Sequence, residues 1–209
     1  MKFSDNIDGA YFFDNIDDAY YILKDYLTHY GDPIEDQRGD KVFQAPIVTL
    51  GFRGHIQEFA QVRSVKVPNT TILNFEGLID YSKQLQDGAI HDFVYTYGNR
   101  LMEHFNVNQY QVIIDKISDD INTRRAIAVT YDATIDSELE DIPCLILIKC
   151  SVYDDCLFMT VVFRSNDIKY AFSSNMYALM NIQLMIAKKL GLKIGDFYYV
   201  GLDSHWKVK

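Results

Sequence analysis

The sequence predicts an α+β domain, in which helices are mixed with strands joined by a hairpin. The run CLILIKCSVYDDCLFMTVVFRS contains two strand-like halves that meet at Asp154 and Asp155, and this pattern predicts the hairpin. The segment NMYALMNIQLMIAKKLG is strongly apolar and predicts a helix at the centre of the core. Because 48% of the 209 residues are hydrophobic, we expect one domain over residues 1–209 with a full-sized core.

The first predicted element is a helix from about Asn15 to Tyr30, where apolar side chains recur at helical spacing and Asp14 is a suitable N-cap. A polar loop, GDPIEDQRGD, follows. Two strands are expected next, in KVFQAPIVTLGF and VRSVKV, although Pro46 weakens the first. Helical spacing returns in FEGLIDYSKQLQDG, which Gly88 is expected to close.

The second half begins with a predicted helix in NQYQVIIDKISDD, whose buried stripe includes Ile113 and Ile117. A strand is expected in RRAIAVTYD, ahead of the hairpin. The apolar helix from Asn175 comes after the hairpin, and DFYYVGLDSHWKVK predicts a last strand.

Composition excludes several classes of protein. A net charge of -9 disfavours non-specific binding of nucleic acid, although a few arginines in one pocket still suffice for a small phosphate. No apolar stretch approaches the ~20 residues that span a bilayer, and the N-terminus does not resemble a signal peptide. Cys144, Cys150 and Cys156 are spaced unlike zinc ligands. We therefore expect a cytoplasmic protein with free thiols, no membrane association and no metal.

Cys144 is the first candidate for chemistry. It follows Pro143 at the start of a strand, and it lies about as far from the predicted turn as Arg164 does. The two residues are therefore expected at the same end of the hairpin, where the cation would stabilise a nucleophilic thiolate. The alternative is a small buried thiol without chemistry, which is our expectation for Cys150 and Cys156.

Arg124 and Arg125 stand side by side before a predicted strand. Adjacent strand residues face opposite sides, so both cannot easily enter one pocket of their own chain. One or both could reach a neighbouring subunit, or the pair is simply an exposed basic turn.

Seven short motifs occur in a distinctive order between Tyr97 and His205: YGNR, TRRA, IPC, RSND, SSN, GDF and DSH. Their order and spacing resemble the thymidylate synthase family, and TRRAIAV and RSND are most similar to its short, archaeal-type members. The resemblance implies a three-layer α/β/α-type fold with a large mixed sheet. It also implies a homodimer in which the two subunits pack sheet against sheet.

The resemblance further implies that Cys144 attacks carbon 6 of dUMP, so that carbon 5 takes up a one-carbon unit and dTMP is formed. The co-substrate would be 5,10-methylene-tetrahydrofolate or a tetrahydromethanopterin analogue. Tyr97 would assist proton removal from carbon 5, and a site glutamate is expected at Glu76, with Glu58 as the alternative. The implied ligands are Arg38, Arg164 and Ser165 for the phosphate, Arg124 and Arg125 from the partner subunit for the same phosphate, Asn175 for the base, His205 for the sugar and Asp167 for the carrier.

Four departures from the family pattern leave the reaction open. Leu145 and Phe163 replace a common histidine and glutamine, and Lys207 replaces a tyrosine that helps to hold the sugar. The sequence ends at Lys209, four residues after His205, where many members continue into a closing tail. The alternatives are a pyrimidine nucleotide hydroxymethylase, acting on dUMP, dCMP or CMP, and a catalytically silent nucleotide-binding homologue. The short C-terminus favours hydroxymethylation, whereas Asn175 favours uracil over cytosine.

Overall fold

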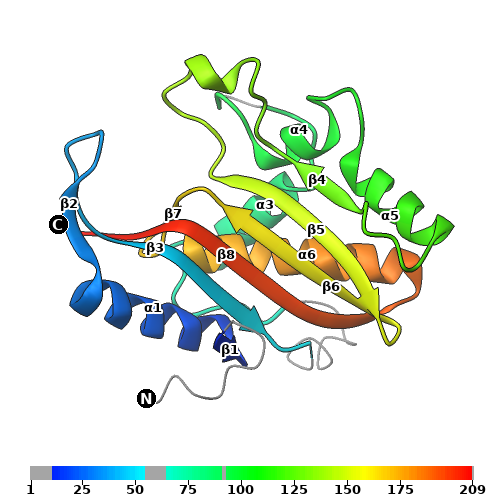
Figure 1. Ribbon diagram of the computed structural model, residues 1–209, viewed down its shortest axis with the longest axis horizontal. Helices are drawn as coiled ribbons and strands as arrows, with labels where there is room; N and C mark the ends of the chain where they lie inside the picture. Colours follow the sequence, from blue (N-terminus) through cyan, green and yellow to red (C-terminus); the bar gives the residue numbers. More distant parts are fainter. Residues whose placement is uncertain (1–10, 55–64, 91–92, 209) are drawn as a thin grey trace.

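The computed structural model describes residues 11–54, 65–90 and 93–208 (Figure 1). Its central feature is an 8-stranded sheet with the order β1-β3-β8-β6-β5-β4, in which β2 also pairs with β3 and β7 with β8. The strands are β1 (Tyr11–Phe13), β2 (Asp32–Glu35), β3 (Lys41–Phe52), β4 (Ile127–Val129), β5 (Leu145–Tyr153), β6 (Cys156–Phe163), β7 (Asn166–Asp167) and β8 (Lys193–Lys207).

The sheet is mixed. The β3–β8, β6–β5 and β5–β4 pairs are antiparallel, whereas β6 and β8 run parallel to each other. The described helices are α1 (Ile16–Tyr30), α3 (Phe75–Gln84), α4 (Tyr97–Met102), α5 (Gln109–Asp119) and α6 (Phe172–Leu190). The predicted mixture of helices with a large mixed sheet is therefore confirmed.

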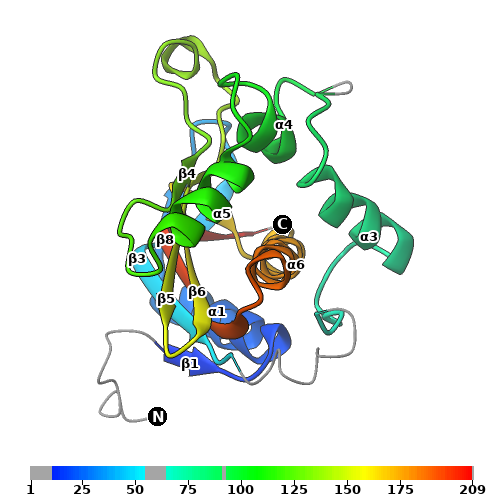
Figure 2. The same cartoon turned by 90° about the vertical axis from the view of Figure 1, so that its right-hand side faces the viewer.

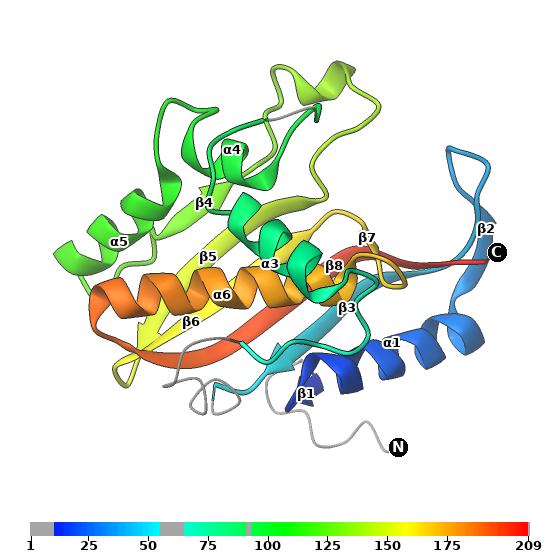
Figure 3. The same ribbon diagram turned by 180° about the vertical axis from the view of Figure 1, so that it is seen from behind.

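The helices of the described residues lie on one face of the sheet (Figures 2 and 3). Figure 2 shows three layers in succession, which are the sheet, then α6, then α3. α6 is the middle layer, and 14 of its 19 residues are buried, as its apolar sequence predicts. This helix therefore carries Asn175, near its N-terminal end, into the interior of the protein.

The hairpin forms where the sequence predicts it. Asp154 and Asp155 have φ angles of 49° and 59°, the left-handed backbone of the two-residue turns that match the twist of paired strands. The register that follows puts Leu145 opposite Phe163 at the far end of the two strands. The residues just outside that pair, Cys144 and Arg164, are brought together for this reason.

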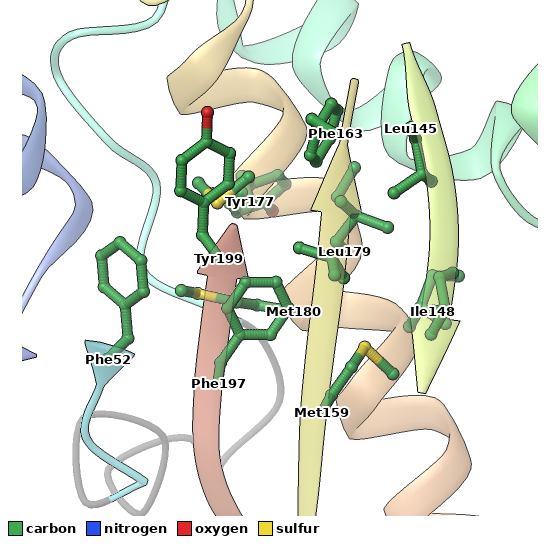
Figure 4. Packing of buried hydrophobic residues seen from close by; sticks show 14 of the residues in the cluster. Phe52, Leu145, Ile148, Met159, Phe163, Tyr177, Leu179, Met180, Phe197 and Tyr199 are labelled. Carbon is green, nitrogen blue, oxygen red and sulfur yellow. The ribbon is translucent and has the colours of Figure 1, made fainter. Parts of the chain in front are cut away.

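The core fills the space between α6 and strands β5, β6 and β8 (Figure 4). Alternate β6 side chains, from Leu157 to Phe163, are buried, while those between them are half-buried, as expected for a strand with one face on the core. Phe197 and Tyr199 of β8 continue the same buried layer.

Several boundaries differ from the prediction. Asn15, not Asp14, caps α1, because its Oδ1 accepts a hydrogen bond from the amide of Asp18 at 2.8 Å. α3 ends at Gln84, before Gly88, and the hydroxyl of Tyr110 binds the carbonyl of Leu85 at that end.

The predicted strand VRSVKV is wrong over residues 65–67, where Val65 packs into the core outside the sheet. Residues 62–64 of that segment lie outside the described residues. The predicted polar loop after α1 contains β2, and RRAIAVTYD forms a strand only over β4. The elements β1, β7 and α4 were not predicted, because they are too short to show a periodic pattern of apolar residues.

The Gln183 side chain connects α6 to the sheet where the pairing of β6 with β8 is irregular. The pairing of β6 with β8 shifts register between Leu157 and Met159. The buried Gln183 side chain spans this shift, because its Nε2 donates to the carbonyls of Leu157 at 2.8 Å and Gly195 at 3.0 Å. The Gln183 side-chain amide therefore supplies hydrogen bonds to backbone carbonyls at the register shift.

We expect Gln183→Met to lower the free energy of unfolding by about 1–3 kcal/mol, because buried carbonyls lose their donor while the side-chain volume is kept. The measurement is urea unfolding followed by circular dichroism. Gln111→Met makes the same chemical change at an exposed position of α5 and should change stability little. Equal midpoints for the two variants would contradict the role assigned to Gln183.

Candidate active site

Cys144 lies next to Arg164 at the open end of the β5–β6 hairpin. The amide of Arg164 donates to the Cys144 carbonyl at 2.8 Å, and its Nη2 lies 3.7 Å from the Cys144 Sγ. Both side chains are half-buried. The pairing of thiol and cation that the sequence predicts is present.

Arg164 is held in place by the segment that precedes the cysteine. Its Nε donates to the carbonyl of Pro143 at 3.0 Å, and Nη2 donates to that of Ile142 at 2.8 Å. The hydroxyl of Tyr95 binds the same Ile142 carbonyl at 3.2 Å. The guanidinium is therefore fixed beside the thiol before any substrate arrives.

The electrostatic environment of Cys144 has two opposing parts. Burial raises the pKa of the Cys144 thiol, and the Arg164 guanidinium lowers it. Asp141 raises this pKa and Arg38 lowers it from further away. The net result is a raised pKa, so the free protein holds the thiol mainly protonated at neutral pH.

Tyr97 lies against the backbone of the cysteine segment. Its hydroxyl accepts a hydrogen bond from the amide of Leu145 at 3.2 Å, and burial raises its pKa well above the ordinary value. Tyr97 is the first residue of α4, and Arg100 of the same helix pairs with Asp136 at 2.6 Å, with both side chains buried. This ion pair anchors the short helix that presents Tyr97.

Asn175 belongs to a buried chain of hydrogen bonds. Its Oδ1 accepts from the hydroxyl of Tyr81 at 2.5 Å, and its Nδ2 donates to Oδ1 of Asn166 at 3.2 Å. Asn166 Nδ2 lies 3.4 Å from the hydroxyl of Tyr199, which in turn pairs with Ser204 at 3.0 Å. These hydrogen bonds connect α3 to α6, β7 and β8.

Ser165, Asp167 and His205 form a second polar group where β7 pairs with β8. Ser165 Oγ lies 3.4 Å from His205 Nδ1, and Asp167 Oδ2 lies 4.0 Å from His205 Nε2. Burial lowers the pKa of His205, while the charge of Asp167 raises it, and the net direction is downward. The imidazole is therefore mainly neutral at pH 7.

Arg38 lies at the turn between β2 and β3, in a region that the end of β8 also reaches (Figure 1). Its exposed side chain lies 3.5 Å from Asp141. Lys207, which departs from the family pattern, pairs with Asp40 of the same turn at 2.7 Å. This ion pair connects the end of β8 to the turn that carries Arg38.

Arg124 and Arg125 lie away from Cys144 and the polar residues near it. Both are exposed, and they line an open surface pocket of about 350 Å³ with residues of the preceding turn and the end of α5. Because Ile127 pairs with Lys149, five residues along β5 from Cys144, even Ile127 is about 16 Å from the cysteine along the strand. The two arginines precede Ile127 and are further away.

The site glutamate stays a prediction. Glu76 is exposed in the first turn of α3, and Glu58 lies outside the described residues. Sequence reasoning missed Tyr81, Tyr95 and Asn166, because nothing separates these residues from ordinary half-buried or buried side chains before their partners are known.

Residues 11–54, 65–90 and 93–208 contain no group of three or more His, Cys, Asp or Glu side chains placed to hold a metal ion. Among the helices that the structure describes, none has the length and apolar character required to cross a membrane.

Comparison with known proteins identifies the family. The sequence model of "Thymidylate synthase" matches residues 55–206. A Methanococcoides burtonii protein named "Putative thymidylate synthase" is 32% identical over 86% of this chain and 80% of its own length. Proteins of the same name from Methanothermobacter thermautotrophicus and Methanocaldococcus jannaschii are 31% and 34% identical, covering 88% and 75% of this chain and 86% and 75% of their own lengths.

The family model covers most of the chain. The matched residues include Cys144 and Arg164, the hydrogen-bonded residues around Asn175, and the polar group of Ser165, Asp167 and His205. The family implies one-carbon transfer with a folate co-substrate in general. The chain therefore belongs to the thymidylate synthase family.

Proposed function

We propose that the protein is a thymidylate synthase, which transfers a one-carbon unit from a reduced folate or pterin to carbon 5 of dUMP and yields dTMP. Membership of the family supports the class of reaction. The single observation that carries the proposal is the Arg164 guanidinium, fixed 3.7 Å from the Cys144 thiol at the open end of the hairpin.

The proposed chemistry begins when the Cys144 thiolate adds to carbon 6 of the uracil, which moves an electron pair to carbon 5. Carbon 5 then bonds to the methylene of 5,10-methylene-tetrahydrofolate or a tetrahydromethanopterin analogue. Loss of the carbon 5 proton breaks the bond between the methylene and the carrier nitrogen, which leaves as an amine, and an exocyclic methylene remains on carbon 5. Hydride from the carrier reduces the methylene to methyl, and the bond between sulfur and carbon 6 breaks. The raised pKa keeps Tyr97 protonated, so Tyr97 would orient the water that accepts the carbon 5 proton.

The proposed nucleotide ligands come from the turn that carries Arg38, from Arg164 and from the polar groups around Asn175 and His205. Arg38, Arg164 and Ser165 would bind the phosphate, since guanidinium groups suit phosphate oxygens. Neutral His205 would bind the sugar hydroxyl, and Asn175 would bind the base. Asp167 would contact the carrier, and the proposed site glutamate is Glu76, with Glu58 as the alternative.

We further propose a homodimer formed by the face of the sheet that carries no described helix. Val129, Leu147, Val162 and Val200 are partners in register, so they form one apolar row across four strands of that face. Val129 is 39% exposed. A second copy would cover the row, and Arg124 and Arg125 at its border would complete the partner's phosphate site.

Tritium release from carbon 5 of labelled dUMP, with methylene-tetrahydrofolate present, tests the reaction. We expect release and a product of dTMP mass, and Cys144→Ser should reduce release by more than about a thousandfold while dUMP still binds. Cys156→Ser, at the other end of the hairpin, is the matched control and should stay active. A hydroxymethylated product would identify the hydroxymethylase instead. Absence of release from dUMP and dCMP, both with methylene-tetrahydrofolate and with methylene-tetrahydromethanopterin, would contradict both activities.

Mixing two inactive variants tests the shared site. Arg125→Ala should bind dUMP weakly, and Cys144→Ala should be inactive. After subunit exchange at equal amounts, about one quarter of wild-type activity should return, because half of the dimers are mixed and each has one intact site of two. Sedimentation confirms the dimer, and exchanged dimers without activity would exclude the contribution of Arg125 across the interface.

The influence of Arg164 on the thiol can be measured by alkylation with iodoacetamide across pH. In a Cys156→Ser background, Arg164→Met should raise the pKa of Cys144 further, because the stronger of the two cations that oppose the effect of burial is removed. The alkylation rate at pH 8 should fall several-fold. Arg53→Met removes an exposed arginine at the opposite end of the sheet, just beyond the Phe52–Phe197 pair, and should leave the profile unchanged. Identical profiles for both variants would refute the assigned role of Arg164.

A further inference from the structure

Tyr81 is a residue of the Asn175 network to which the proposed function assigns no role. It comes from α3, the outer layer, and its hydroxyl reaches Asn175 near the N-terminal end of α6 at 2.5 Å. Asn175 is only 5% exposed, so its side-chain amide must satisfy its hydrogen bonds with a small number of partners.

The Tyr81 hydroxyl donates this hydrogen bond and the Asn175 oxygen accepts it. Burial raises the pKa of the Tyr81 hydroxyl far above neutrality, so the group keeps its proton. Among the described residues, the acceptor for that proton is Oδ1 of Asn175. Nδ2 of the same amide donates to Oδ1 of Asn166. Reversing the amide would turn Nδ2 toward Tyr81 and leave the tyrosine proton without this acceptor.

The fixed orientation leaves a defined pair of groups for a ligand. A side-chain amide has two lone pairs on oxygen and two N–H groups. Tyr81 uses one lone pair and Asn166 uses one N–H, so one acceptor and one donor remain. Uracil offers an N–H at position 3 and a carbonyl oxygen at position 4, which complement this pair, whereas cytosine offers an unprotonated nitrogen and an amino group.

We propose that Tyr81 is a positioning residue that makes the protein select uracil over cytosine by holding the Asn175 amide in one orientation. This inference rests on the proposed function, since it assigns base recognition to Asn175. A freely turning amide would accept either base, because its reversed orientation complements cytosine. Selectivity is therefore a property of the tyrosine and asparagine pair, and not of the asparagine alone.

Calorimetric binding of dUMP and dCMP to the intact protein tests the proposal. Tyr81→Phe keeps the ring and removes only the hydroxyl, so the fold should be retained, as circular dichroism can verify. The ratio of dCMP to dUMP dissociation constants should fall about three- to tenfold, as expected for loss of one hydrogen bond. Tyr95→Phe removes a hydroxyl that binds the Ile142 carbonyl and should leave the ratio unchanged.

A double-mutant cycle shows whether Tyr81 acts through Asn175. In an Asn175→Ala background, Tyr81→Phe should no longer change the ratio, whereas a purely structural effect would persist. If the wild type prefers dUMP and Tyr81→Phe leaves the ratio of dissociation constants unchanged, the inference fails while the proposed function stands. If the wild type binds neither nucleotide, the proposed function fails and the inference fails with it.

Discussion

The arrangement of the site depends on how Arg164 is held. Its amide closes the end of the β5–β6 ladder on the Cys144 carbonyl, and its guanidinium binds the backbone of Ile142 and Pro143. One cation thus fixes the segment before the cysteine and lies beside the sulfur. The positive charge of Arg164 offsets part of the effect of burial on the pKa of the Cys144 thiol. The contacts that hold Arg164 against this segment therefore also keep that pKa lower than burial alone would make it.

The second constraint is the position of α6 between the sheet and α3. A middle layer is buried on two sides, which explains why this helix is apolar around most of its circumference. Gln183 is an exception, and its amide satisfies carbonyls at the β6–β8 register shift. The same burial surrounds Asn175 with fixed partners, including Tyr81 from the outer layer. The packing that stabilises the fold therefore also orients the side chain that we propose binds the base.

The sequence predicts those parts of the fold that local patterns determine. The Asp154–Asp155 turn, the helices α1, α5 and α6 and the meeting of Cys144 with Arg164 follow from turn chemistry, periodicity and equal distance from the turn. The strand predicted in VRSVKV was wrong over residues 65–67, because alternation cannot tell whether a partner strand exists. Tyr81 could not be found, because its role depends on a contact 94 residues away in the chain. The choice between Glu76 and Glu58 needs tertiary placement of the same kind and stays a prediction.

The row formed by Val129, Leu147, Val162 and Val200 has a consequence for the newly made chain. An apolar stripe across a sheet remains in contact with water until another surface covers it. Assembly of the proposed homodimer and aggregation would then compete for the same face, and both depend on protein concentration. Overproduction at high temperature, where the hydrophobic attraction between such stripes remains strong, would favour insoluble material even though each chain is correctly folded. Slower synthesis at lower temperature would favour the soluble protein.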